Sequence, residues 1–103
     1  MKYKNELIDA INCAINAMDS RLNQEDSDKY YIGKMITRLN RLVNELKKSD
    51  YSPDYDELLE ISLMTTGYIK NRDFSEKDYC FFDKMHIVKK IIHKIFDENN
   101  IKY

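Results

Sequence analysis

The segment MTTGYIKNRDFSEKD, residues 64–78, marks the place where one predicted helix ends and the next begins. Residues 71–73 form a short polar connection, and Ser75-Glu76-Lys77-Asp78 then has the spacing of a capping box. In this motif the Ser75 hydroxyl accepts a hydrogen bond from the Asp78 N–H, and the Asp78 carboxylate accepts one from the Ser75 N–H. The segment therefore predicts a helix start at residue 76.

Two further residues of this segment are expected to support the fold. Phe74 stands just before the capping box, where it is expected to pack against Tyr79 as a hydrophobic staple. Gly67 lies inside the preceding helical pattern, although glycine costs about 1 kcal/mol relative to alanine in a helix interior. Its presence predicts a close approach of a neighbouring helix. We assign Gly67, Phe74, Ser75 and Asp78 to structural roles.

Length and composition indicate one soluble domain, residues 1–103, that needs neither disulfides nor a metal. The net charge is −1, 34% of residues are charged, and there are only one Pro and two Gly. No apolar run approaches the ~18–20 residues of a membrane span, and the first residues do not resemble a signal peptide, so we expect a cytoplasmic protein that does not bind membranes. Cys13 and Cys80 are expected to be reduced, buried thiols.

Apolar residues recur with a helical period in four segments. The first covers residues 2–22 and the second about 28–48. The third begins with Ser52 as N-cap and Pro53 as first helical residue, and the fourth covers 76–97. The expected core positions are Leu7, Ile8, Ile11, Ile15, Met18, Leu22, Ile32, Met35, Ile36, Leu39, Leu42, Val43, Leu46, Tyr55, Leu58, Leu59, Ser62, Thr66, Ile69, Tyr79, Phe82, Met85, Val88, Ile92, Ile95 and Phe96.

Short connections between these segments force successive helices to reverse direction. The sequence therefore predicts an all-α fold, a single antiparallel up-down-up-down four-helix bundle, with a frayed tail at 99–103. In such a bundle the first and third loops share one end. Acidic residues of the two loops are then expected to meet there, namely Glu25, Asp26, Asp28, Asp73, Glu76 and Asp78.

Carboxylates and tyrosines are interleaved between residues 50 and 60, where no Lys or Arg occurs. One interpretation is a docking face for a basic partner, in which tyrosine supplies contact area and carboxylates steer the encounter. The other is helix capping, because anions in a first turn are favoured by about 0.3–1 kcal/mol. Both interpretations remain open for this cluster, which comprises Asp50, Tyr51, Asp54, Tyr55, Asp56, Glu57 and Glu60.

Other kinds of site find little support. Lys34, Arg38 and Arg41 share one face of the second helix, and a second basic group lies on the diagonal fourth helix, so no continuous nucleic-acid footprint is expected. Asp83 and His86 have the spacing of a di-iron ligand pair, but no second such pair exists, and we expect no metal. No nucleophile motif or glycine-rich phosphate loop occurs, so we expect no enzyme activity, cofactor or small-molecule substrate.

One segment resembles a known family. Gly67, Ile69, Arg72-Asp73-Phe74, Glu76 and Asp78 match the pattern of small all-helical immunity proteins that neutralise NAD(P)-hydrolysing effectors of type VI secretion. A weaker likeness covers roughly residues 8–88. Family members are small and apolar around the glycine, whereas this chain has Thr66, Tyr68 and Lys70.

The resemblance implies an antitoxin that takes part in bacterial competition. It would bind a cognate interbacterial toxin domain, an NAD(P)-glycohydrolase or a tRNA nuclease, and block its active site. The expected toxin contacts are Tyr51, Asp54, Tyr55, Asp56, Glu57, Glu60 and Tyr68. The alternatives are a phage-encoded inhibitor of a host defence enzyme and a helical nucleic-acid-binding or adaptor module.

Overall fold

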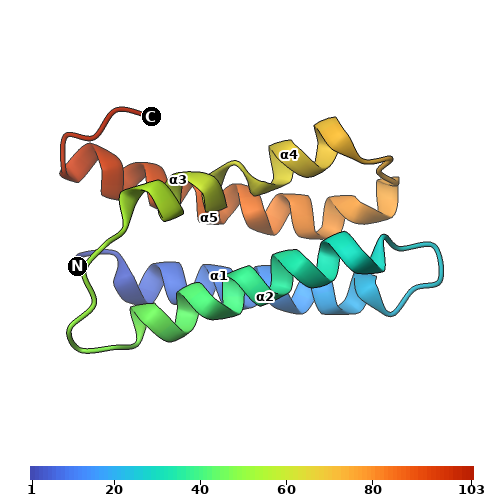
Figure 1. Ribbon diagram of the computed structural model, residues 1–103, viewed down its shortest axis with the longest axis horizontal. Helices are drawn as coiled ribbons and strands as arrows, with labels where there is room; N and C mark the ends of the chain where they lie inside the picture. The colour runs from blue at the N-terminus through green and yellow to red at the C-terminus, as the bar shows by residue number, and fades with distance from the viewer.

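In the computed structural model, which describes residues 1–103, the first two helices form a hairpin (Figure 1). Helix α1 spans Lys4–Leu22 and helix α2 spans Lys29–Leu46. The α2 helix begins at an Asp28 N-cap, whose carboxylate accepts a hydrogen bond from the Tyr31 N–H at 3.1 Å. Both helices lie close to the predicted segments because their apolar stripes are continuous.

The third predicted helix is in fact two short helices, α3 at Tyr55–Ser62 and α4 at Met64–Asn71. They meet at Leu63, whose N–H is shared between the carbonyls of Leu59 and Glu60 at 3.1 and 3.2 Å. The Ser62 hydroxyl also donates to the Leu59 carbonyl at 2.6 Å, a local bond that competes with the helical pattern. The prediction of four helices is therefore wrong, and the chain has five α-helices.

The predicted start of the third helix is also displaced. Asp54, not Ser52, is the N-cap of α3, and its carboxylate accepts from the Glu57 N–H at 3.2 Å. Pro53 consequently precedes the helix instead of opening it.

The capping box of the opening segment is confirmed. Ser75 caps a 3₁₀ turn, η1 at Glu76–Asp78, which leads directly into α5 at Tyr79–Glu98. The Ser75 N–H donates to the Asp78 carboxylate at 3.0 Å, and the Ser75 hydroxyl accepts from the Lys77 N–H at 3.2 Å. The rings of Phe74 and Tyr79 lie 6.3 Å apart, as expected for a staple.

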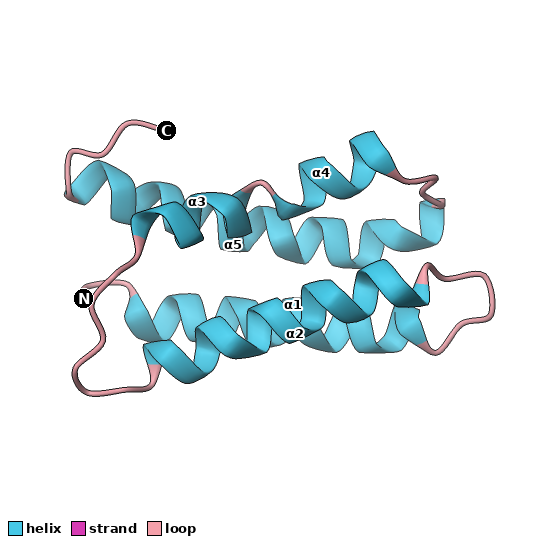
Figure 2. Ribbon diagram, viewed as in Figure 1, coloured by secondary structure: helices cyan, strands magenta, loops and turns pink.

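Helices α1 and α2, the arm of α3 and α4, and helix α5 alternate in direction along a molecule of 40 × 26 × 17 Å (Figure 1). Helix α1 packs against both α2 and α5, and α3 packs against α5. Figure 2 shows helices and loops without a strand, so the prediction of an all-helical fold is confirmed. No helix is both long enough and apolar enough to cross a bilayer.

The core is one cluster of 22 buried hydrophobic residues contributed by all five α-helices. Most predicted core positions are buried or packed against this cluster, but the stripe on α5 is rotated. Phe81 is fully buried there, Phe82 is only partly buried, and Tyr79 is 50% exposed. Thr66 and Ile69 are also exposed, since the break at Leu63 changes the register of α4.

A buried ion pair joins the two loops at one end of the molecule. The Arg21 Nε donates to Asp78 Oδ1 at 2.6 Å, and the Tyr68 hydroxyl donates to Asp78 Oδ2 at 3.0 Å. All three side chains are almost fully buried. This network ties α1 to α4 and to the start of α5.

Two smaller predictions need correction. Cys13 and Cys80 are exposed, so the prediction of buried thiols is wrong. The tail after α5 is not helical, but it folds back onto the helix and is not frayed (Figure 1). The Ile101 N–H donates to the Phe96 carbonyl at 2.9 Å, and the Tyr103 ring stacks on His93 at 4.1 Å.

Candidate protein-binding site

A cation from the neighbouring helix α2 pairs with carboxylates of the predicted acidic face. Arg38 of α2 donates from Nε and Nη2 to the two carboxylate oxygens of Glu57, at 3.1 and 3.0 Å. The same guanidinium also bonds Glu60. These hydrogen bonds, above all those to Glu57, raise the pKa of Arg38 above its usual value.

Two of the predicted contact carboxylates are therefore already partnered within the chain, and Asp54 is occupied as the cap of α3. The sequence places Arg38 on the same face of α2 as Lys34 and Arg41. Its position opposite α3 follows only from how the two helices are juxtaposed. Among the remaining acids of this face, Asp50 and Asp56 are exposed and form no ion pair.

The three tyrosines predicted as contacts differ in exposure. Tyr51 is half-buried, and burial raises the pKa of its hydroxyl. Tyr55 is also half-buried, with its ring 6.1 Å from that of Phe96. Tyr68 is only 1% exposed and its hydroxyl is bonded to Asp78, so its side chain cannot contact a partner in this conformation.

The four residues assigned to structural roles are all located near the α4–α5 turn. Three of them act as described above: Ser75 and Asp78 form the capping box and Phe74 packs on Tyr79. Gly67 does not match its prediction. A Cβ added there would meet only the Tyr31 hydroxyl, at 3.7 Å, which is an ordinary contact. No neighbouring helix backbone approaches Gly67 closely.

The end formed by the first and third loops contains ion pairs between the loops, not a free acidic patch. Arg72 donates to Asp28 at 2.7 Å, and the hydrogen bond from Arg72 lowers the pKa of that carboxyl. Lys77 lies 3.2 Å from Asp26, which also pairs with Arg21 at 2.9 Å. The sequence correctly predicted that these loops meet.

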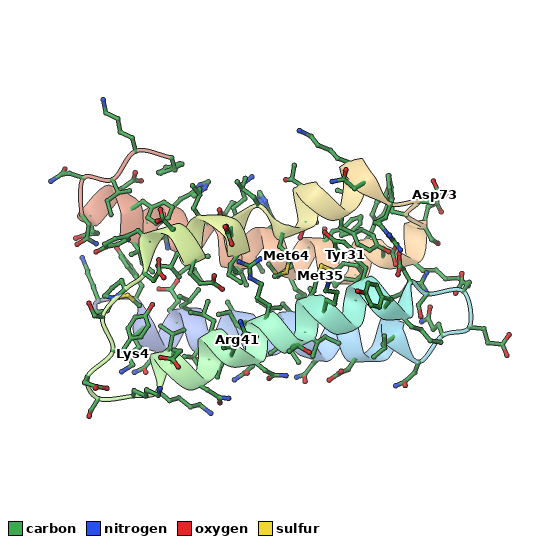
Figure 3. All side chains as sticks on the ribbon, viewed as in Figure 1. Lys4, Tyr31, Met35, Arg41, Met64 and Asp73 are labelled. Atoms are coloured by element: carbon green, nitrogen blue, oxygen red, sulfur yellow. The ribbon has the colours of Figure 1, made fainter.

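An open groove runs between α2 on one side and α3 and α4 on the other. Its volume is about 1000 Å³. Figure 3 shows Tyr31, Met35 and Arg41 on α2 and Met64 on α4, across the space between the two arms. Met35 and Met64 are nearly buried and line the groove, whereas Leu63 is 46% exposed. The full lining is Lys29, Tyr30, Tyr31, Gly33, Lys34, Met35, Thr37, Arg38, Arg41, Glu57, Glu60, Leu63, Met64 and Gly67.

Both glycines of the chain line this groove. Neither has a positive φ, so no turn requires them. A Cβ added at Gly33 would meet nothing within 4 Å. Packing within the chain therefore explains neither glycine.

The cations of the groove divide into paired and unpaired ones. Arg38 is held by Glu57 and Glu60, as described. Lys34 has no carboxylate partner and lies over the Tyr30 ring, 4.9 Å from its centroid. Arg41 is exposed and makes no ion pair. The basic face of α2 is thus interrupted at Arg38, while Lys34 and Arg41 remain available to a partner.

The remaining chemistry-bearing residues do not converge on one place. No group of three or more His, Cys, Asp or Glu side chains is arranged to hold a metal ion. Comparison with known proteins finds no matching family model, no matching characterised protein and no matching solved structure.

Proposed function

We propose that this chain is an immunity protein that binds a toxin domain in the cytoplasm and blocks its active site, without a cofactor or chemistry of its own. The observation that carries the proposal is the open groove between α2 and the α3–α4 arm, with the acidic α3 beside it. We further infer that the architecture is a four-helix bundle whose third arm consists of α3 and α4.

Several features support a protein as the partner. The groove has a floor of flexible methionine side chains, which adapt to a partner surface. Its rim exposes Tyr30 and Leu63, and tyrosine is a residue type enriched at protein interfaces. The resemblance of Gly67–Asp78 to immunity proteins adds the class of partner: a toxin that hydrolyses NAD(P) or cuts tRNA.

Within the predicted contact set, Asp56 is the carboxylate best placed to meet a basic toxin surface, because it is exposed and unpaired. Asp50 lies outside that set but belongs to the same acidic cluster, and it is also exposed and unpaired. Tyr51 and Tyr55 flank them and are partly exposed. Glu57 and Glu60 share the single positive charge of Arg38, so together these three residues would present one net negative charge to the toxin.

Co-expression with the toxin domain encoded beside this gene tests the proposal. Cells that express the toxin should survive with this chain and die without it. The double variant Asp50→Lys/Asp56→Lys should reduce protection while its helicity stays unchanged. Asp83→Lys, at an exposed position on α5, is the matched control and should protect fully. Death of cells that carry the unaltered chain would refute the proposal.

A further inference from the structure

We infer that the groove between α2 and the α3–α4 arm is the seat of an acidic α-helix of the partner, with carboxylates spaced about seven residues apart. This inference rests on the proposed function for the partner's identity, but the groove itself can be tested separately. It follows from three features of the groove: its two glycines, its length and its unpaired charges.

The glycines imply that something approaches from outside the chain. A helical glycine costs about 1 kcal/mol relative to alanine, and a methyl group would fit at both Gly33 and Gly67. Glycine at a helix surface allows another backbone to come closer than any side chain would permit. Nothing in this chain fills the space beside Gly33, and only the Tyr31 hydroxyl borders Gly67, so an external helix is the occupant that the glycines suit.

The length of the groove suits about three turns of helix. Its lining on α2 extends from Lys29 to Arg41, a span of about 18 Å at 1.5 Å per residue. Its apolar lining residues include Met35, Leu63 and Met64, which would face one stripe of an amphipathic helix, as in helix-in-groove recognition.

The unpaired cations of the groove indicate which charges the partner helix should carry. Lys34 and Arg41 are two helical turns apart on α2, about 10 Å along its axis, and neither has a carboxylate partner. An aligned helix with carboxylates at i and i+7 can pair with both cations. Glu57 and Glu60 share the single positive charge of Arg38 and keep one net negative charge, so the partner's carboxylates should lie beside Lys34 and Arg41 and away from this pair.

The first experiment uses a fluorescein-labelled, 14-residue helical peptide with leucines on one face, alanines beside them and two glutamates seven residues apart. A second peptide has lysines in place of the two glutamates. Fluorescence anisotropy should show binding of the glutamate peptide and at least about tenfold weaker binding of the lysine peptide. In the variant Lys34→Glu/Arg41→Glu this preference should reverse.

Filling the groove separates binding from folding. Gly33→Leu places a side chain in open space on α2 and improves helix propensity, so its urea midpoint should equal or exceed that of the unaltered chain. Its affinity for the glutamate peptide should nevertheless fall about tenfold or more. Asn40→Leu, at an exposed α2 position outside the groove, is the matched control and should bind normally.

The inference is overturned if the glutamate peptide fails to bind, binds no better than the lysine peptide, or binds equally well to Gly33→Leu. The second experiment repeats both variants in the toxin co-expression assay. If both variants still protect cells, the groove is not the toxin-binding site, and the proposed function stands. If the unaltered chain binds the glutamate peptide but does not protect cells from the toxin, the proposed function is refuted and the inference about the groove stands.

Discussion

At the scale of single residues, the Asp78 side chain connects three parts of the protein. Its carboxylate accepts hydrogen bonds from the Arg21 guanidinium, the Tyr68 hydroxyl and the Ser75 N–H. A buried guanidinium without its counter-ion is costly, because it loses both water and its partner. Asp78 therefore holds together the only place where α1, α4 and α5 share a polar contact network.

Asp78→Ala should lower the free energy of unfolding by about 3 kcal/mol, because it removes the buried partner of Arg21 and leaves the guanidinium paired only with the exposed Asp26. Urea denaturation followed by circular dichroism measures this loss. Asp83→Ala, at an exposed aspartate on α5, is the control and should change stability by no more than about 0.5 kcal/mol. A loss below about 1 kcal/mol for Asp78→Ala would contradict the importance of the ion pair.

Thr65 presents the opposite case, a polar atom without a partner. Its buried hydroxyl oxygen makes no hydrogen bond. Valine has nearly the same shape, so Thr65→Val removes the unsatisfied group without opening a cavity. The free energy of unfolding should rise by about 1 kcal/mol in a urea titration. The adjacent, exposed Thr66 provides the matched control, and Thr66→Val should give no such gain.

At the scale of secondary-structure elements, the sequence predicts some helices well and others poorly. The α1, α2 and α5 helices were predicted because each has an apolar stripe that continues over its whole length. The break between α3 and α4 was not predicted, because the helix propensity of leucine at position 63 gives no sign that the helix stops there. It depends on the Ser62 hydroxyl bond and on packing against α5.

Polar contacts between elements were the hardest to predict. Arg21 and Asp78 are separated by 57 positions, and nothing local marks either one as buried. Nothing near Arg38 in the sequence predicts its ion pair either, because Glu57 belongs to another helix. The predicted site on α3 stays a prediction, and two of its carboxylates are paired within the chain.

The α4 helix should be the least protected helix of the fold. It has eight residues and only two of them, Met64 and Tyr68, are buried, whereas α5 has seven buried residues. Short helices depend on such packing for their stability. In hydrogen exchange, the α4 amides should exchange before those of α1 and α5. Met64→Ala should accelerate this exchange, and Leu63→Ala, at the exposed neighbouring position, should have little effect.

If the α4 amides were protected as long as those of α5, the α3–α4 arm would open only with the whole molecule. The groove wall would then be rigid, and a partner helix would have to fit it without rearrangement.

At the scale of the whole molecule, the two ends of the bundle should respond to different ranges of pH. At one end, Tyr103 of the tail stacks on His93. At the other end, Asp26 and Asp28 pair with cations of the third loop (Figure 1). Hydrogen bonds from Arg21 and Arg72, respectively, lower the pKa values of these two carboxyls.

Burial lowers the pKa of His93 below its usual value of 6.5, and the charge of Lys89 lowers it further, while Asp97 acts in the opposite direction. The unfolded chain therefore binds a proton at this residue more readily than the folded one. The stability that neutral His93 contributes is present above pH 6.5 and is lost as the pH falls through its folded pKa.

The urea midpoint should accordingly fall between about pH 7.5 and 5.5, and His93→Phe, which keeps the ring stack, should lessen this fall. His86→Gln, on the same helix but exposed, is the control. A second fall should begin only below about pH 4, when Asp26 and Asp28 become protonated, and Arg72→Ala should reduce it. An identical pH profile for His93→Phe and the unaltered chain would show that protonation of His93 does not contribute to the pH dependence of stability.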